Sequence, residues 1–199
     1  AGVVMDGSNY VSEWQDQSGN GFHLTQTNST NQPIFTENIV NGKPVLNFNG
    51  DYMQLTFGEV FSQPITIFIL MKFNSSQSNQ YITSGSYQFH VVSTSQGTFF
   101  RAGASYPSGL KYFPTLPSSN FFVSSLIANS SSSRIFENGL LVKSGNAGSN
   151  GLASLTIGAT TSGSYPLNGY IAEIIIYNAL LSDSEREQVE KYLMDKYSP

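Results

Sequence analysis

The chain has 199 residues and a formal net charge of −4, with 11% charged residues and no cysteine. This length suits a single domain of about 100–200 residues with a sizeable buried core. Nine lysine and arginine residues are too few for a basic patch that would neutralise a nucleic-acid backbone or an anionic membrane surface. The lack of cysteine excludes disulfides, thiolate nucleophiles and cysteine-bound zinc. No apolar run reaches the roughly 18 residues that a membrane-spanning helix needs.

Most of the chain consists of short alternating or β-branched runs, which are typical of strands. The longest run, 65–73, is apolar almost throughout, and this predicts a strand that is covered on both faces. The dipeptide Asn138-Gly139 tolerates positive φ at both positions and predicts a hairpin between two of the runs. The predicted strands are 44–48, 65–73, 87–92, 98–101, 121–127, 134–137, 140–143, 154–157 and 170–177. About nine to twelve short strands with polar turns predict an all-β sandwich or barrel.

One segment, 182–197, has the pattern of a helix. Ser182 is an N-cap, and Glu185 three residues later completes a capping box. A narrow apolar stripe recurs every four residues from Val189 to Tyr197, and acidic residues gather in the first turn, where the helix dipole favours them. The segment therefore predicts a short C-terminal helix with one face on the sandwich.

Three stretches of sequence carry a resemblance to a known family. They are Val11-Ser-Glu-Trp-Gln-Asp-Gln-Ser-Gly-Asn-Gly21, then Asn41-Gly-Lys-Pro-Val-Leu-Asn-Phe-Asn-Gly-Asp51, and a third that runs from Glu137-Asn-Gly-Leu-Leu-Val through Gly169-Tyr-Ile-Ala-Glu-Ile-Ile-Ile-Tyr-Asn178 to Leu181-Ser-Asp-Ser-Glu-Arg. Together they resemble the laminin-G-like jelly-roll domains of the concanavalin A-like lectin/glucanase superfamily. The resemblance implies a two-sheet antiparallel jelly-roll β-sandwich with a short C-terminal α-helix, formed as one domain over residues 1–199.

The resemblance includes glucanases, but the acidic pattern of those enzymes is missing. In glucanases one strand carries acids at alternate positions, which puts the carboxylates on one sheet face about 5–6 Å apart. The only alternating acids here lie at 183–187, on the predicted helix, where they diverge. We therefore expect no enzyme activity and no catalytic residues. Convergence of Glu137 and Glu173 in a cleft would revive the enzyme hypothesis.

The resemblance also raises the question of calcium, which some laminin-G-like relatives hold at one sheet edge. Asp16, Asn49 and Asp51 lie in the matching turns. Calcium needs several clustered oxygens, whereas Asp16 and Asp51 are well placed to cap their own turns. We expect no metal or cofactor, with calcium as the alternative. Trp14 lies in a recurrent motif of the family and is expected to pack against the sandwich.

The candidate binding residues lie in the middle of the chain, where aromatic residues are dense. With Phe100 in the core, alternation turns Phe99 and Arg101 outward, and with Phe89 in the core it turns the neighbours of Phe89 outward. Aromatic rings stack on apolar sugar faces, while amide, imidazole and guanidinium groups bind hydroxyls. The predicted ligand-binding residues are Gln88, His90, Phe99, Arg101, Tyr106 and Tyr112. The alternative is that these aromatic residues form the core and the seam between the sheets.

The sequence thus predicts a non-catalytic glycan-recognition or adhesion module that binds an oligo- or polysaccharide. Its Ser/Thr/Asn-rich, lysine-poor composition favours a location that is extracellular, on the cell surface or on a virion. We expect the module to form part of a larger protein or a homo-oligomer. The alternative is a structural or protein-interaction module, such as a virion or fibre decoration or an assembly domain. In that case the outward aromatic residues would form a subunit interface instead of a groove.

Overall fold

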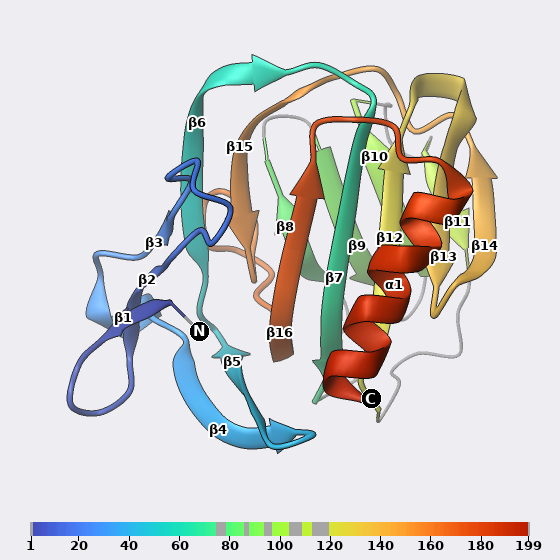
Figure 1. Cartoon of the computed structure of the whole chain (residues 1–199). Helices are drawn as coiled ribbons and strands as arrows, with labels where there is room; N and C mark the ends of the chain where they lie inside the picture. Colours follow the sequence, from blue (N-terminus) through green and yellow to red (C-terminus); the bar gives the residue numbers. More distant parts are fainter. Residues whose placement is uncertain are drawn as a thin grey trace.

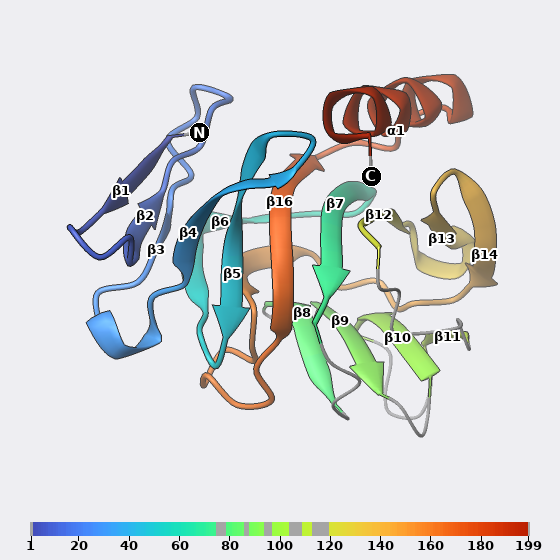
Figure 2. The ribbon, with the colours of Figure 1, turned by 90° about the horizontal axis from the view of Figure 1, so that it is seen from below.

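The chain folds into two antiparallel sheets that pack face to face, with one α-helix on the outer face of the second sheet (Figure 1). The computed structural model describes residues 2–74, 79–85, 88–93, 97–103, 109–112 and 120–198, and for 88–93 and Gly97 it describes the backbone. This architecture is the two-sheet antiparallel sandwich with a C-terminal helix that the sequence predicts. Figure 2 shows the helix lying above one layer, with the second layer on the far side.

The first sheet has nine strands in the order β1-β2-β3-β6-β15-β8-β9-β10-β11. These strands are β1 (Val3–Met5), β2 (Val11–Trp14), β3 (Leu24–Thr25), β6 (Met53–Phe61), β15 (Leu152–Ile157), β8 (Gln80–Ser84), β9 (Gln88–Ser93), β10 (Gly97–Ala102) and β11 (Leu110–Tyr112). Several of them, including β6 and β8, are not among the predicted strands. In β6, Met53, Leu55 and Phe57 alternate toward the core, a signal that is present in the sequence but was missed in the prediction.

The second sheet has seven strands in the order β14-β13-β12-β7-β16-β5-β4. These strands are β14 (Leu140–Gly145), β13 (Ser133–Glu137), β12 (Phe122–Ala128), β7 (Ile65–Phe73), β16 (Asn168–Tyr177), β5 (Lys43–Asn49) and β4 (Ile34–Val40). The hairpin predicted at Asn138-Gly139 is confirmed, because φ is 48° at Asn138 and 82° at Gly139 and the turn joins β13 to β14. Two short 3-10 turns, Ser29–Asn31 and Ser130–Ser132, complete the described elements outside the helix.

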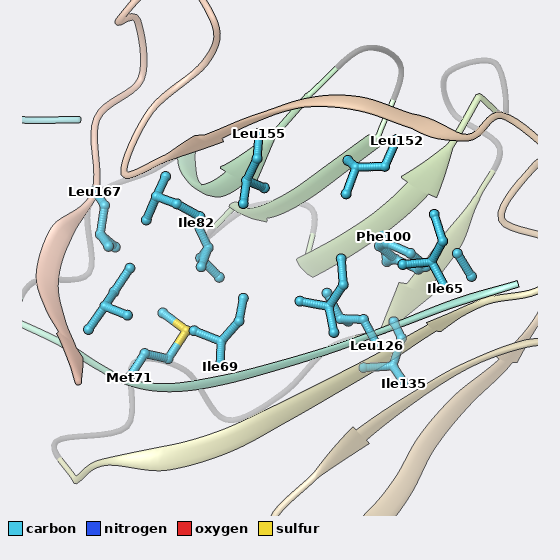
Figure 3. Close-up of a cluster of buried hydrophobic side chains, with 14 of the residues drawn as sticks. Ile65, Ile69, Met71, Ile82, Phe100, Leu126, Ile135, Leu152, Leu155 and Leu167 are labelled. Atoms are coloured by element: carbon cyan, nitrogen blue, oxygen red, sulfur yellow. The ribbon is translucent and has the colours of Figure 1, made fainter. Parts of the chain in front are cut away.

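The core lies between the two sheets and is built around β7. Ile65, Ile69 and Met71 of β7 point toward Ile82 and Phe100 of the first sheet (Figure 3). The alternate residues of β7 pack under the helix instead, so the predicted cover on both faces is confirmed. Trp14 packs against the inter-sheet cluster, as predicted.

The helix α1 (Asp183–Tyr197) begins with the predicted capping box. The Glu185 amide donates to Ser182 Oγ at 3.3 Å, and the Ser182 amide donates to Glu185 Oε2 at 2.8 Å. Leu193 and Tyr197 pack on Phe68 and other residues of the second sheet. No helix in the described part of the chain has the length and hydropathy needed to cross a bilayer.

Candidate functional site

The predicted binding residues of β10 lie on the face opposite the inter-sheet core. Phe100 belongs to the core cluster, and its neighbour Phe99 is excluded from it. Phe99 is nevertheless only 5% exposed, and the Lys111 ammonium lies 5.1 Å from the centre of its ring. Arg101 is half-buried, and its side chain lies over Gly109, where an added Cβ would collide with Arg101 Cγ. Alternation placed these side chains on a face, but the tertiary structure leaves Phe99 little surface on which a sugar could stack.

Gln88 and His90 lie in β9, whose backbone is described while its side chains are not. The strand register pairs Gln88 with Ala102 and His90 with Phe100, and both partners are core residues. Directly opposite residues of antiparallel strands share a face. The register therefore places positions 88 and 90 on the core side of the sheet, whereas Phe99 and Arg101 lie on the other side. The role of Gln88 and His90 in binding stays a prediction.

Tyr112 joins the two sheets. Its hydroxyl donates a hydrogen bond to the Glu137 carboxylate, which links β11 to β13. Burial raises the pKa of Glu137, although the bond from Tyr112 partly offsets this, and burial together with the adjacent carboxylate raises the pKa of Tyr112. Tyr112 is 8% exposed and lies at the seam between the sheets, which is the arrangement the alternative hypothesis describes. Tyr106 lies outside the described residues, and its role stays a prediction.

A different set of aromatic side chains surrounds the loop between β15 and β16. Tyr165 is 55% exposed, and its ring stacks on that of Tyr81 with 5.9 Å between ring centres and 26° between ring planes. The Tyr81 amide donates to the Tyr165 carbonyl at 3.1 Å, which holds the loop to β8. Tyr52 lies against Gly163, where a Cβ would approach Tyr52 Cε1 to 2.8 Å. We call Tyr52, Tyr81 and Tyr165 the tyrosine rim.

The loop is held in shape by its own hydrogen bonds. The Thr160 amide donates to the Ser164 carbonyl, and the Ser164 amide donates to Thr160 Oγ1, each at 2.9 Å. Tyr165 follows with φ of 53°, a left-handed conformation that is uncommon for a bulky side chain. A left-handed backbone at a residue other than glycine lowers the stability of the fold by on the order of 1–3 kcal/mol, and such residues cluster at functional sites. The strained backbone turns the Tyr165 ring onto Tyr81.

Neutral polar groups lie beside the tyrosine rim. Gln54 Nε2 donates to the Thr161 carbonyl at 2.8 Å and to Thr156 Oγ1 at 3.3 Å. Ser162 and Ser164 are exposed, and their hydroxyls are 3.3 Å apart. An exposed ring beside hydroxyl and amide groups can stack on one face of a sugar and hydrogen-bond to its edge. The predicted binding set missed Tyr165, although its place in a Ser/Gly-rich segment between two strands was a signal.

The acidic residues considered for calcium serve their own turns. The Ser18 and Phe22 amides donate to the Asp16 carboxylate at 2.8 and 3.1 Å. Partial burial opposes these bonds, but their net effect is to lower the pKa of Asp16. The Asn49 amide donates to Asp51 Oδ2 at 2.9 Å, so both aspartates cap turns as predicted. Within the described ranges, no group of three or more His, Asp and Glu side chains gathers where a metal could bind.

Glu137 and Glu173, whose convergence would suggest a hydrolase, have separate partners. Glu137 accepts from Tyr112 between the sheets. Glu173 pairs with Lys196 Nζ at 2.6 Å and accepts from the Tyr197 hydroxyl at 2.8 Å, both of which belong to α1. The two carboxylates therefore share no partner.

Comparison with known proteins supports the fold. Among solved structures, domain 4 of an extracellular GH43 arabinanase from Geobacillus stearothermophilus, in complex with arabinotriose, has a TM-score of 0.63 and 18% identity, covering 77% of this chain and 79% of that chain. The binding domain of Paraclostridial Mosquitocidal Protein 1 has a TM-score of 0.67 and 13% identity, covering 96% and 52%. The binding domain of botulinum neurotoxin DC, in complex with SialylT, has a TM-score of 0.60 and 14% identity, covering 93% and 51%.

The chain thus spans about half the length of the toxin binding domains and most of the arabinanase domain. At these identities the likeness concerns the fold. A search of curated protein sequences finds no match. A family model described as the concanavalin A-like lectin/glucanases superfamily matches residues 47–185, from β5 to the first turn of α1. The chain belongs to the concanavalin A-like lectin/glucanases superfamily.

Proposed function

We propose that this chain is a non-catalytic glycan-recognition module that binds an oligo- or polysaccharide at the tyrosine rim. The observation that carries the proposal is the Tyr165 ring, which is 55% exposed and stacked on Tyr81 beside a loop of hydroxyl groups. An exposed aromatic ring offers a large apolar face on which the C–H groups of a sugar can pack. The hydroxyl and amide groups around the ring supply the orientation that stacking alone does not.

Two structural neighbours support a sugar as the ligand. The arabinanase domain was solved with arabinotriose, and the botulinum neurotoxin DC domain was solved with SialylT. Because the rim is an open surface, one site would bind weakly, with Kd on the order of 10⁻⁵–10⁻³ M. Useful strength would come from several copies on a larger protein that is extracellular, on the cell surface or on a virion.

The charge of the site narrows the class of glycan. The tyrosine rim and the adjoining groups of Gln54, Ser162 and Ser164 are neutral. An acidic glycan would require a cation such as Arg101, which is half-buried over Gly109. The site therefore favours a neutral saccharide and needs no metal.

The test is a glycan array probed with the multivalent domain, once with calcium and once with EDTA. We expect a neutral glycan to bind under both conditions, and Tyr165→Ala to weaken that binding about tenfold because the stacking surface is lost. Tyr10→Ala is the matched control, because Tyr10 is 38% exposed and lies next to β2, outside the rim. Equal binding by Tyr165→Ala and the parent would contradict the site. Loss of binding with EDTA would point to the Asp16 and Asp51 turns instead.

A second candidate function, protein interaction, is favoured by one observation. From Glu173 to Tyr177, β16 has a strand partner on one side only, in the part of the chain that the structure describes. Such an edge offers main-chain hydrogen bonds to another chain.

A further inference from the structure

The second half of β16 forms an open sheet edge. β5 pairs with β16 only from Asn168 to Ile171, while β7 pairs with it as far as Tyr177. No strand among the described residues pairs with the other side of Glu173–Tyr177. Ile174, Ile175 and Ile176 are each only half-buried there, on both faces of the strand. Ile174 and Ile176 pack on the inter-sheet cluster and Ile175 packs on the cluster under the helix, and each keeps part of its apolar surface exposed.

The local sequence explains why the pairing ends. If the ladder continued beyond Ile171 and Leu46, Pro44 would lie opposite Glu173, and proline has no amide hydrogen to donate. The β4–β5 hairpin leans instead toward the end of the helix, where Asn41 Nδ2 donates to the Lys196 carbonyl at 3.3 Å. The edge is therefore left open by the fold itself.

A groove of about 560 Å³ runs between this half of β16 and the helix. Glu173, Ile175 and Tyr177 of β16 line one side, and Glu185, Gln188 and Tyr192 of α1 line the other. We call this set the β16 groove. Tyr177 and Tyr192 are 37% and 46% exposed, while the aliphatic residues give the groove an apolar lining. Figure 1 shows α1 lying over the β7 and β12 side of the sheet, to one side of β16, and Tyr192 and Lys196 of α1 reach Glu173 with their side chains.

We propose that the β16 groove and the adjoining strand edge bind an extended peptide with alternating β-branched residues and a basic end. The peptide adds as a strand beside Glu173–Tyr177, and its main-chain groups pair with those of the edge. Its alternate side chains cover Ile174 on one face and extend the contact with Ile175 and Tyr177 on the other. A segment of five residues spans about 16 Å of edge, enough for a short strand.

Charge selects the peptide. The groove lining contains two carboxylates, Glu173 and Glu185, and no lysine or arginine. Lys196 pairs with Glu173 at one end, whereas Glu185 is fully exposed at the other. A basic residue of the peptide next to Glu185 therefore meets a complementary charge.

Other occupants fit less well. A second copy paired edge to edge would bring together two sets of these carboxylates, on chains that each carry a net charge of −4. A saccharide would contact the tyrosines but leave the main-chain groups of the edge without strand partners. The proposed glycan site is separate, because the tyrosine rim lies at the β15–β16 loop, before β16 begins.

The test uses three synthetic peptides of about eight residues with alternating valine and threonine. The first has lysine at both ends, the second has glutamate at both ends, and the third repeats the first with alternate backbone amides N-methylated. Binding is measured by fluorescence anisotropy, and hydrogen exchange is followed at the amides of Glu173–Tyr177. We expect the lysine peptide to bind and to protect these amides, and the other two to bind at least about tenfold more weakly.

Variants of the protein sharpen the test. Gln188→Lys places a positive charge in the groove without removing a contact to the sheet, and it is expected to weaken the lysine peptide about fivefold. Gln17→Lys makes the same change in charge on the exposed loop between β2 and β3 and is expected to have no effect. Tyr165→Ala is expected to weaken glycan binding and to leave peptide binding unchanged. The glycan proposal and the peptide proposal can therefore fail independently of each other.

Three results would overturn the proposal. The first is no binding of the lysine peptide up to about 1 mM, or equal binding of the N-methylated peptide. The second is a dimer in light scattering whose edge amides are protected without peptide, because a second copy would then be the occupant. The third is a glycan-array signal that Gln188→Lys removes, which would assign the groove to a saccharide.

Discussion

β7 and β16 are neighbouring isoleucine-rich strands in one sheet, yet their environments differ. β7 is buried along almost its whole length, including Phe68 and Ile69 at 0% exposure. β16 has its last six residues half-buried or exposed. β7 has strand partners on both sides and is covered by the first sheet and the helix, whereas β16 loses β5 after Ile171.

The comparison shows that an apolar run in the sequence does not predict how many strands pair with it in the sheet. The sequence predicts cover on both faces for β7, and β16 likewise carries β-branched residues at successive positions. The helix supplies that cover mainly over β7 and β12, where Glu190 accepts from Ser125 Oγ at 2.7 Å. The edge of β16 is open because β5 stops pairing with it after Ile171, and no local pattern in the sequence encodes where that pairing ends.

The largest expected effect concerns the contact that places the helix over β12. Arg186 and Glu190 form an ion pair in which each residue is 4% exposed, and Arg186 also lies 3.9 Å from the centre of the Phe136 ring. Glu190→Ala leaves the Arg186 charge buried without this partner, so we expect a loss of about 4 kcal/mol in the free energy of unfolding. Urea unfolding followed by the fluorescence of the single tryptophan, Trp14, measures it.

The matched control is an exposed pair with the same spacing, five residues further along the helix. Lys191 and Asp195 are 74% and 64% exposed, and they lie 2.8 Å apart. Lys191→Ala is expected to cost less than about 0.5 kcal/mol, because exposed pairs are screened by water and salt. Similar losses for the two variants would mean that the buried pair does not hold the helix in place.

The next largest effect tests the two strands directly. Ile69→Ala in β7 leaves a cavity at a fully buried position, and we expect a loss of about 3 kcal/mol. Ile175→Ala in β16 is expected to cost about 1 kcal/mol, because its side chain is half-buried and buries less area to begin with. Both are read from the same urea titration. Equal costs would show that the edge of β16 is covered in solution.

The third effect, smaller than the loss expected for Ile69→Ala, concerns the β11–β13 end of the sandwich, where Tyr112 and Glu137 join the two sheets. Burial raises the pKa of Glu137 in the folded state above its pKa in the unfolded chain. The folded state is therefore favoured fully at pH values below the unfolded pKa, where Glu137 is protonated, and this stability is lost as pH rises through the folded pKa. The hydrogen bond from Tyr112 offsets part of that loss, since it favours the carboxylate. Tyr112→Phe is therefore expected to cost about 2 kcal/mol near pH 7 and less near pH 4.

Urea unfolding at the two pH values checks this. The variant Glu137→Gln supplies the control, because it keeps a hydrogen-bond acceptor but does not titrate. In that background the effect of Tyr112→Phe is expected to be the same at both pH values. An equal loss at both values with Glu137 intact would show that the charge of the carboxylate plays no part.

Much of the fold could be predicted because its signals are local. The strand 65–73 coincides with β7, and the other eight predicted runs overlap strands of the structure within a few residues. Several of the missing strands are very short, such as β1 with three residues and β3 with two, and so few residues show no alternation that would predict a strand.

The candidate site was harder to predict, because its residues come from distant parts of the chain. Alternation along β10 separated Phe100 from Phe99 correctly, but only packing decided that Phe99 would be 5% exposed. The tyrosine rim joins Tyr52 of the β5–β6 connection, Tyr81 of β8 and Tyr165 of the β15–β16 loop, and no spacing in the sequence links them. The ring that is most exposed is also the one with left-handed backbone, a feature that residue type does not reveal.

The sequence by itself determined the class of fold, the hairpin at Asn138-Gly139, the start of the helix at Ser182 and the turns capped by Asp16 and Asp51. Each of these depends on hydrogen bonds or dihedral preferences within a few residues. The tertiary structure alone decided which aromatic side chains reach the surface, where the helix lies and which strand is left with an open edge. Those outcomes depend on neighbours brought together from across the chain, and local preferences carry no information about them.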